Sequence, residues 1–117
     1  MSPAASRRSD GQDPAAAVFA ALGDTVRREL LRTLAVDGPA SATLLADGRG
    51  ITRQAVAKHL AVLGRAGLVS PERHGREVRY RAQGEALSSA TEWIEQTGAA
   101  WDRRLERLTD LVDPPSA

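Results

Sequence analysis

The chain has 117 residues, 42% of them hydrophobic but only 3% aromatic, so we expect one small domain with a core of Leu, Val and Ala. It contains no Cys, which excludes disulfides and thiolate metal sites, and no apolar run of about 18 residues that could span a membrane. The net charge is only +1, yet residues 49–81 carry eight Lys or Arg against two Asp or Glu, a local net of +6. Such a basic segment is typical of a surface that binds a polyanion.

The two ends of the chain are expected to be disordered. Residues 1–12, MSPAASRRSDGQ, lack the apolar stretch of a signal peptide, and residues 113–117 contain two consecutive prolines. This leaves residues 13–112 as the folded domain. The lack of a signal peptide, of a membrane span and of Cys favours a cytoplasmic protein.

Two helices are predicted in the first third of the chain. Asp13 and Pro14 are suited to the N-cap and first helical position, and Gly23 marks the end of that helix. Asp24 is suited to cap a second helix that runs to about Val36. Its apolar stripe consists of Val26, Leu30, Leu31 and Leu34. Its outer face carries three arginines that we expect to be solvated: Arg27, Arg28 and Arg32.

A helix-turn-helix follows the Gly38-Pro39 break. Ser41 is expected to cap a short helix with Leu44 and Leu45 turned inward, and residues 48–50, Gly-Arg-Gly, lead into a helix that is capped by Thr52. Two helices joined by a short glycine-containing turn have this arrangement. Because an apolar residue normally pins such a turn, an arginine at this position predicts a loose one.

The helix from Thr52 to Gly67 has two different faces. One face is an apolar stripe formed by Val56, Leu60 and Leu63. The opposite face carries an amide, two cations and small residues: Gln54, Lys58, Arg65, Ala57 and Ala61. In a DNA major groove, Gln reads adenine, and cations meet guanine or phosphate. Taken alone, such a face favours simple solvation, but its position in a helix-turn-helix favours DNA recognition.

After Gly67 the sequence predicts a β-hairpin, because apolar and charged residues alternate with a period of two. A first strand leads to Arg73, residues 74–76 form the turn, and residues 77–81 return. The two faces of the return strand differ, with Val78 and Tyr80 inward and Arg79 and Arg81 outward. Directly after a helix-turn-helix, this hairpin is expected to be a DNA-contacting wing rather than only a solvated hairpin.

A long helix is predicted from about Glu85 to Val112. Its apolar residues form one stripe: Leu87, Ile94, Trp101, Leu105, Leu108 and Val112. At 1.5 Å per residue this stripe is roughly 40 Å long, more than a small core covers, so part of it should meet another subunit. Trp93 and Trp101 are large aromatic residues of the kind that anchor interfaces, although both could instead pack on their own domain. Gly98 could bend the helix.

The chain resembles the ArsR/SmtB-type family of bacterial winged helix-turn-helix repressors in three segments, ALGDTVRRELLRTLAVDGPAS, ITRQAVAKHLAVLGRAGLV and ERHGREVRYR. The resemblance covers about residues 18–112. It implies a mainly α fold with a small β-hairpin, dimeric through its terminal helices. It also implies a homodimer that represses transcription from a palindromic operator, with the helix from Thr52 as recognition helix and the hairpin as wing.

Two sets of residues are candidates for binding. The predicted DNA-binding residues are Thr52, Arg53, Gln54, Lys58, Arg73, Arg76 and Arg79. The predicted dimer-interface residues are Phe19, Trp93, Trp101, Leu105 and Leu108. The alternative function is a winged-helix interaction module that docks an acidic protein partner.

Metal sensing and catalysis are not expected. Metal-sensing relatives use cysteines or ligands on the last helix, whereas this chain has no Cys and only two histidines, fifteen residues apart. His59 is expected to be a hydrogen-bonded structural residue, and His74 a wing-tip residue. The chain thus resembles the branch without a thiolate sensor, and a carboxylate-only site for a hard ion stays open. No catalytic triad or phosphate loop occurs at usable spacing, so we expect neither an enzyme nor a cofactor.

Overall fold

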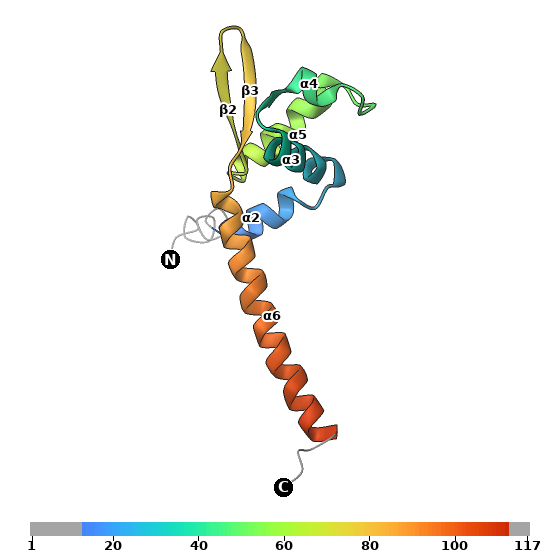
Figure 1. Ribbon diagram of the computed structural model, residues 1–117, viewed down its shortest axis with the longest axis vertical. Helices are drawn as coiled ribbons and strands as arrows, with labels where there is room; N and C mark the ends of the chain where they lie inside the picture. Colours follow the sequence, from blue (N-terminus) through green and yellow to red (C-terminus); the bar gives the residue numbers. More distant parts are fainter. Residues whose placement is uncertain (1–12, 113–117) are drawn as a thin grey trace, which may run out of the picture.

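The structure, a computed structural model, describes residues 13–112, and the two tails expected at residues 1–12 and 113–117 lie outside this part. A head of helices and a hairpin sits at one end of a long helix, α6, which projects away from it (Figure 1). In chain order the elements are α2 (Pro14–Ala21), α3 (Thr25–Asp37), β1 (Ala40–Ser41), α4 (Ala42–Ala46), α5 (Arg53–Arg65), β2 (Val69–His74), β3 (Glu77–Ala82) and α6 (Glu85–Val112). The predicted mainly helical, winged fold is confirmed.

The four predicted helix caps are also confirmed. The side-chain oxygens of these caps accept hydrogen bonds from backbone N–H groups three residues ahead, at 3.0–3.1 Å; the capping residues are Asp13, Asp24, Ser41 and Thr52. Each such cap stabilises its helix by about 1 kcal/mol. Short-range chemistry in the sequence therefore determines where these helices begin.

The core lies between α3 and α5, with contributions from α2 and the hairpin. Its fully buried large side chains are Val18, Leu30, Val56, Leu60, Leu63 and Leu68. The predicted apolar stripes of α3 and α5 are thus confirmed, with Val26 only partly buried. The expectation for α4 was half wrong, since Leu45 is buried but Leu44 is 62% exposed. Adjacent residues of an α-helix point in different directions, so in this five-residue helix only one of the two adjacent leucines faces the core.

The hairpin is confirmed and belongs to a three-stranded antiparallel sheet of order β1-β3-β2. Gly75, with φ of +65°, occupies the two-residue turn, where a positive φ matches the twist of the strands. Strand β1, in which Ala40 pairs with Tyr80 and Ser41 with Arg79, was not predicted from the sequence. Through this short strand the start of α4 is held beside the hairpin.

The corner between α2 and α3 corrects the expectation that Arg27 and Arg28 are merely solvated. The Arg27 Nε donates a hydrogen bond to the Ala21 carbonyl oxygen at 2.6 Å, and the Arg28 Nη1 donates one to Leu22 O at the same distance. These carbonyls belong to the last turn of α2, which has no further helical N–H groups to satisfy them. The third arginine of the helix, Arg32, is exposed as predicted.

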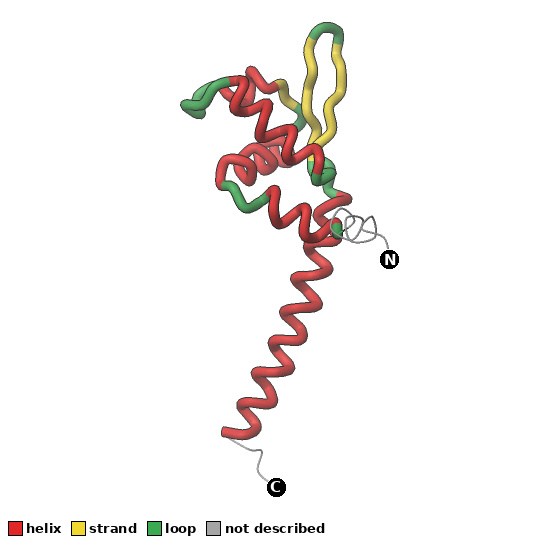
Figure 2. The backbone as a smooth tube through the Cα atoms, turned by 180° about the vertical axis from the view of Figure 1, so that it is seen from behind, coloured by secondary structure: helices red, strands yellow, loops and turns green. Residues whose placement is uncertain are grey.

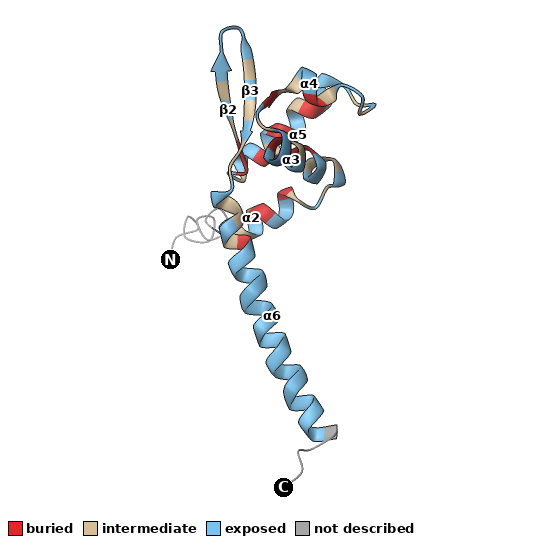
Figure 3. Cartoon of the chain, viewed as in Figure 1, coloured by how far each residue is buried: buried red, intermediate tan, exposed pale blue. Residues whose placement is uncertain are grey.

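Helix α6 runs without interruption through Gly98 and forms a stem. Only its beginning packs on the head, beside α2, as Figure 2 shows from behind. Among the residues of α6 whose burial is described, Ala90 is the last buried one, and residues 91–111 are all exposed (Figure 3). Within residues 13–112, no helix combines the length and apolar character needed to cross a membrane.

Candidate nucleic-acid interface

Helix α5 packs against the rest of the head along one face and is closed by hydrogen bonds at its C-terminal end. Its inner face is fully buried, and its C-terminal end closes with the Leu68 N–H on Leu63 O at 2.9 Å and the Gly67 N–H on Gly64 O at 3.0 Å. Gly67 has a φ of +78°, which this type of helix end requires and a glycine adopts without strain. A helix held at both ends and along one face can present its other face in a fixed orientation.

The outward face of α5 carries the predicted reading residues. Thr52, Arg53, Gln54 and Lys58 are all exposed, and Ala57 between them is half-buried. Among residues 13–112, the side chains of Arg53, Gln54 and Lys58 form no hydrogen bond or ion pair with the protein. Their donors and acceptors are therefore available to a ligand, and the small alanine lets that ligand approach the helix backbone closely.

The wing residues fall into two groups. Arg76 at the tip is exposed, and Arg73 makes only a long 3.5 Å contact with Gly75 O. By contrast, Arg79, also predicted to bind DNA, has its Nε 2.7 Å from the Glu77 carboxylate. The structure therefore brings Arg79 to the wing but gives its charge a partner within the protein.

A second ion pair lies on the same strand pair. The guanidinium of Arg81 donates to both carboxylate oxygens of Glu72, at 3.1 and 3.2 Å. This pairing lowers the pKa of Glu72 below its ordinary value and raises the pKa of Arg81 above its ordinary value. The His74 Nε2 lies 3.7 Å from the same carboxylate, at the wing tip as expected. The basic excess that the wing offers to a ligand is therefore concentrated at Arg73 and Arg76.

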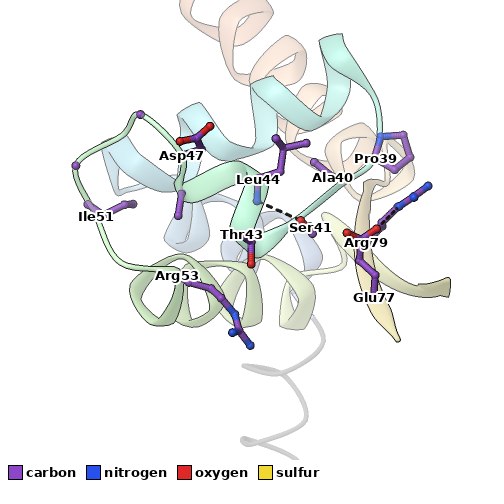
Figure 4. Close-up of a pocket in the computed structure, with 13 residues that line it drawn as sticks. Pro39, Ala40, Ser41, Thr43, Leu44, Asp47, Ile51, Arg53, Glu77 and Arg79 are labelled. Carbon is purple, nitrogen blue, oxygen red and sulfur yellow. Dashed lines mark hydrogen bonds and ion pairs between the residues drawn. The ribbon is translucent and has the colours of Figure 1, made fainter. Parts of the chain in front are cut away.

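Two adjoining grooves separate α5 from the wing. The narrower one is lined by the start of α4, by Arg53 and by the wing residues Arg76 and Tyr80. The wider one is lined mostly by β1, α4 and the turn after it, including Asp47, and also by Arg53, Glu77 and Arg79. Figure 4 shows Thr43 and Arg53 on one side and Glu77 and Arg79 on the strand β3. The charged residues of the narrower groove are Arg53, Arg76 and Glu77, whereas in the wider one Asp47 and Glu77 balance Arg53 and Arg79. Of the two, the narrower groove therefore has the net positive charge that suits a phosphate strand. Sequence reasoning missed Thr43, because only the undetected strand β1 places α4 beside the wing.

The helix-turn-helix turn contradicts the expected looseness. Gly48 and Gly50 both have a positive φ, of 76° and 75°, and the side chain of Arg49 between them reaches back to α3. Its Nη2 donates to Thr33 Oγ1 at 2.6 Å, and its Nη1 lies 4.0 Å from the Glu29 carboxylate. A polar link thus replaces the apolar residue that usually pins this turn, and it fixes the start of α5 relative to α3.

Replacing Arg49 with Met should destabilise the fold by about 1.5–3 kcal/mol, because a charge-assisted hydrogen bond is lost from a side chain that is only a quarter exposed. Urea unfolding monitored by circular dichroism measures this. Thr33→Val removes the acceptor instead, and the double variant should cost less than the sum of the two single changes. Additive costs would mean that the two side chains do not support each other.

The two histidines lie in different surroundings. The His59 Nδ1 is 3.9 Å from Asp24 Oδ2, too long for a hydrogen bond, and within residues 13–112 the His59 side chain forms none, contrary to the expectation of a hydrogen-bonded His59. The pKa of Asp24 is lowered mainly by the hydrogen bond that it accepts from the Arg27 backbone N–H. Among residues 13–112, no group of three or more His, Asp or Glu side chains gathers in a way that could hold a metal ion.

The predicted interface residues lie along α2 and the stem. Phe19 and Trp93 pack edge to face, with ring centroids 5.4 Å apart. Trp101 is 56% exposed farther along α6, with the Arg104 guanidinium 6.0 Å from its ring centroid. Leu105 and Leu108 follow it on the stem and are also exposed. Phe19 and Trp93 thus lie together, whereas Trp101, Leu105 and Leu108 lie on the part of the stem that projects away from the head.

Comparisons with known proteins agree with this architecture. A family profile described as a helix-turn-helix domain matches residues 22–72. YuzN, an HTH-type transcriptional regulator of Bacillus subtilis (strain 168), is 38% identical over 86 residues, which cover 68% of this chain and 94% of YuzN.

Solved structures are similar as well. An ArsR-like transcriptional regulator from Rhodococcus sp. RHA1 is 44% identical, with a TM-score of 0.72 over 84% of this chain and 92% of that one. The homodimeric winged helix-turn-helix DNA-binding domain Mb0332 from Mycobacterium bovis is 25% identical, with a TM-score of 0.61 over 85% and 88% of the two chains. The relatives with the higher identities are transcriptional regulators, not enzymes. The chain therefore belongs to the ArsR family of helix-turn-helix transcriptional regulators.

Proposed function

We propose that this protein is a cytoplasmic, homodimeric repressor that binds a palindromic DNA operator in a sequence-specific manner. The observation that carries the proposal is the outward face of α5, on which Gln54 and Lys58 are exposed without a partner among the described residues and flanked by small residues. An amide and a cation one turn apart on a protruding helix suit the edges of bases in a major groove.

The remaining DNA contacts follow from the position of the wing beside α5. With α5 in the major groove, the groove that contains Arg53 and Arg76 takes one phosphate strand. Thr52 and Arg53 lie at the start of α5, where the free N–H groups of the helix favour an anion. Arg73 and Arg76 then reach the flanking phosphates or the minor groove from the tip of the wing.

The exposed stem supports the homodimer. Trp101, Leu105 and Leu108 present a row of large apolar side chains that the chain's own head does not cover. The similar domain from Mycobacterium bovis is homodimeric. A two-fold dimer built through α2 and α6 displays two copies of α5, and this symmetry matches a palindromic operator.

The test is a binding titration with DNA that flanks the protein's own gene, followed by footprinting, against random DNA of equal length at several salt concentrations. The proposal requires a protected palindromic site, a preference over random DNA and a steep salt dependence. Placing that site before a reporter gene should lower its expression when the protein is present. Salt-sensitive binding to any acidic polymer, without sequence preference, would favour the alternative of an acidic protein partner.

Glu77 should weaken non-specific binding, because its carboxylate lines both grooves and pairs with Arg79. Replacing it with Gln removes one charge that repels phosphate and frees one cation. We expect affinity for random DNA to rise about three- to tenfold and the salt slope to steepen by roughly one unit. Fluorescence anisotropy at several salt concentrations measures both.

Glu95→Gln provides the matched control, since it makes the same charge change on the exposed stem. It should shift random-DNA affinity less than Glu77→Gln does. Equal effects of the two changes would show that only net charge matters and that Arg79 is not released.

A further inference from the structure

The corner between α2 and α3 is fastened by an unusual set of side-chain contacts. Arg27 donates from Nε to Ala21 O at 2.6 Å and from Nη2 to Ala20 O at 3.3 Å, while Arg28 donates from Nη1 to Leu22 O at 2.6 Å. Three consecutive carbonyls at the end of α2 therefore receive guanidinium donors. Cations at a helix C-terminus also interact favourably with the helix dipole.

Helix α2 is the element that this corner holds in place, and it belongs to both parts of the molecule. On one side Phe19 packs against Trp93 of the stem, and on the other Val18 is completely buried in the core of the head. Figures 1 and 2 both show α2 between the stem and the rest of the head. Any rotation of α2 at its corner would therefore turn the stem relative to the head.

The same corner also reaches the recognition helix. Asp24 caps α3 by accepting a hydrogen bond from the Arg27 N–H at 3.0 Å, and its carboxylate lies 3.9 Å from His59 Nδ1 of α5, too far for a hydrogen bond. The corner thus lies close to α5 through Asp24, although no hydrogen bond joins Asp24 to His59. Elsewhere the stem joins the head where the Gln83 N–H donates to Leu68 O at 2.8 Å, next to the start of α6.

We propose that Arg27 and Arg28 are positioning residues that fix the angle between α2, on which the stem packs, and the rest of the head. They would thereby set the spacing of the two recognition helices. The inference rests on the proposed DNA-binding homodimer. In a two-fold dimer joined through the stems, a change of this angle acts in both protomers at once. Half-sites about 34 Å apart on one face of the duplex tolerate little variation in that spacing.

The first experiment measures the spacing without DNA. Because the chain has no Cys, Ala61→Cys on the exposed side of α5 accepts a single spin label per protomer. We expect a narrow distribution of label-to-label distances in the otherwise unchanged protein, and a broad or displaced one after Arg27→Met/Arg28→Met. Arg32→Met is the matched control, because Arg32 lies on the same helix but forms no hydrogen bond or ion pair among residues 13–112, and it should leave the distribution narrow.

An unchanged distribution in the double variant overturns the inference. If the double variant does not fold, as judged by circular dichroism, the comparison uses Arg28→Met, whose side chain is exposed, and Arg28→Lys, which restores one donor and should partly restore the narrow distribution. If the parent protein gives no distance between protomers, it is a monomer, and both the dimer and the inference fail.

The second experiment compares DNA with one half-site and with two. The double variant should lose about tenfold in affinity for the two-half-site operator because the pre-organised spacing is lost, while the single half-site changes less than about twofold. Equal losses on both DNAs would overturn the positioning role and indicate a direct or purely structural one. A parent protein that prefers neither DNA over random sequence refutes the proposed function, while the spin-label experiment still reports on the corner.

Discussion

Replacing Trp101 with Ala should weaken the proposed dimer. The ring is 56% exposed on the stem, where the chain's own head offers nothing to cover it, and buried tryptophans dominate the energies of many interfaces. Truncating such an anchor costs about 2 kcal/mol or more, which raises the dimer dissociation constant roughly 30-fold. Sedimentation equilibrium over a concentration series measures that constant directly.

The control for this change is Arg103→Ala on the same exposed helix, which removes a large side chain without removing an apolar anchor. It should leave the dissociation constant within a few-fold of the parent value. Operator affinity should fall together with dimerisation in Trp101→Ala, because one half-site provides too few contacts. A parent protein that sediments as a monomer at micromolar concentration would rule out the stem as an interface.

The parts of the fold that depend on short-range chemistry were predictable from the sequence. Caps such as Asp24 and Thr52 are chosen by hydrogen bonds that span three residues, and the stripe of α5 by a spacing along one helix. The hairpin was equally visible, since Gly75 and the alternating strand define both the turn and its faces. Each of these signals lies within the helix or hairpin that it specifies, or directly beside it.

The parts that were missed depend on partners far along the chain or on elements too short to leave a pattern. Strand β1 has only two residues, too few for an alternating pattern to repeat, so the placement of Thr43 beside the wing could not be foreseen. The partner of Arg49 is Thr33, sixteen residues away, and an arginine between glycines gives no hint of it. Long polar side chains reach several ångströms in many directions, so their contacts are decided by tertiary structure.

In the candidate site, too, some features could be predicted from the sequence and others could not. Residues of the α5 outer face followed from helical periodicity, and their exposure agrees with that prediction. The ion pair of Arg79 did not follow from the sequence. The sequence places Arg79 on a basic strand but cannot reveal that Glu77 pairs with Arg79 rather than with Arg73. Charge patterns locate a basic surface, whereas the pairing of individual charges needs the three-dimensional arrangement.

Gln54 and Arg76 should separate base reading from backbone anchoring. Gln54 is exposed near the start of α5, so its amide can reach a base edge in the major groove, whereas Arg76 at the wing tip reaches phosphate or the minor groove. Gln54→Ala should cost about 1–3 kcal/mol on the operator and flatten the preference over random DNA. Arg76→Ala should weaken both DNAs about equally and lower the salt slope by roughly one unit.

Titrating both variants against operator and random DNA at several salt concentrations decides between these roles. The two changes act as controls for each other, since one removes a neutral hydrogen-bonding group and the other a charge, both from exposed positions. A Gln54→Ala protein that keeps the full operator-to-random ratio would show that α5 does not read the sequence at this position. An Arg76→Ala protein that loses that ratio would move the reading function to the wing, because a phosphate contact carries no sequence information.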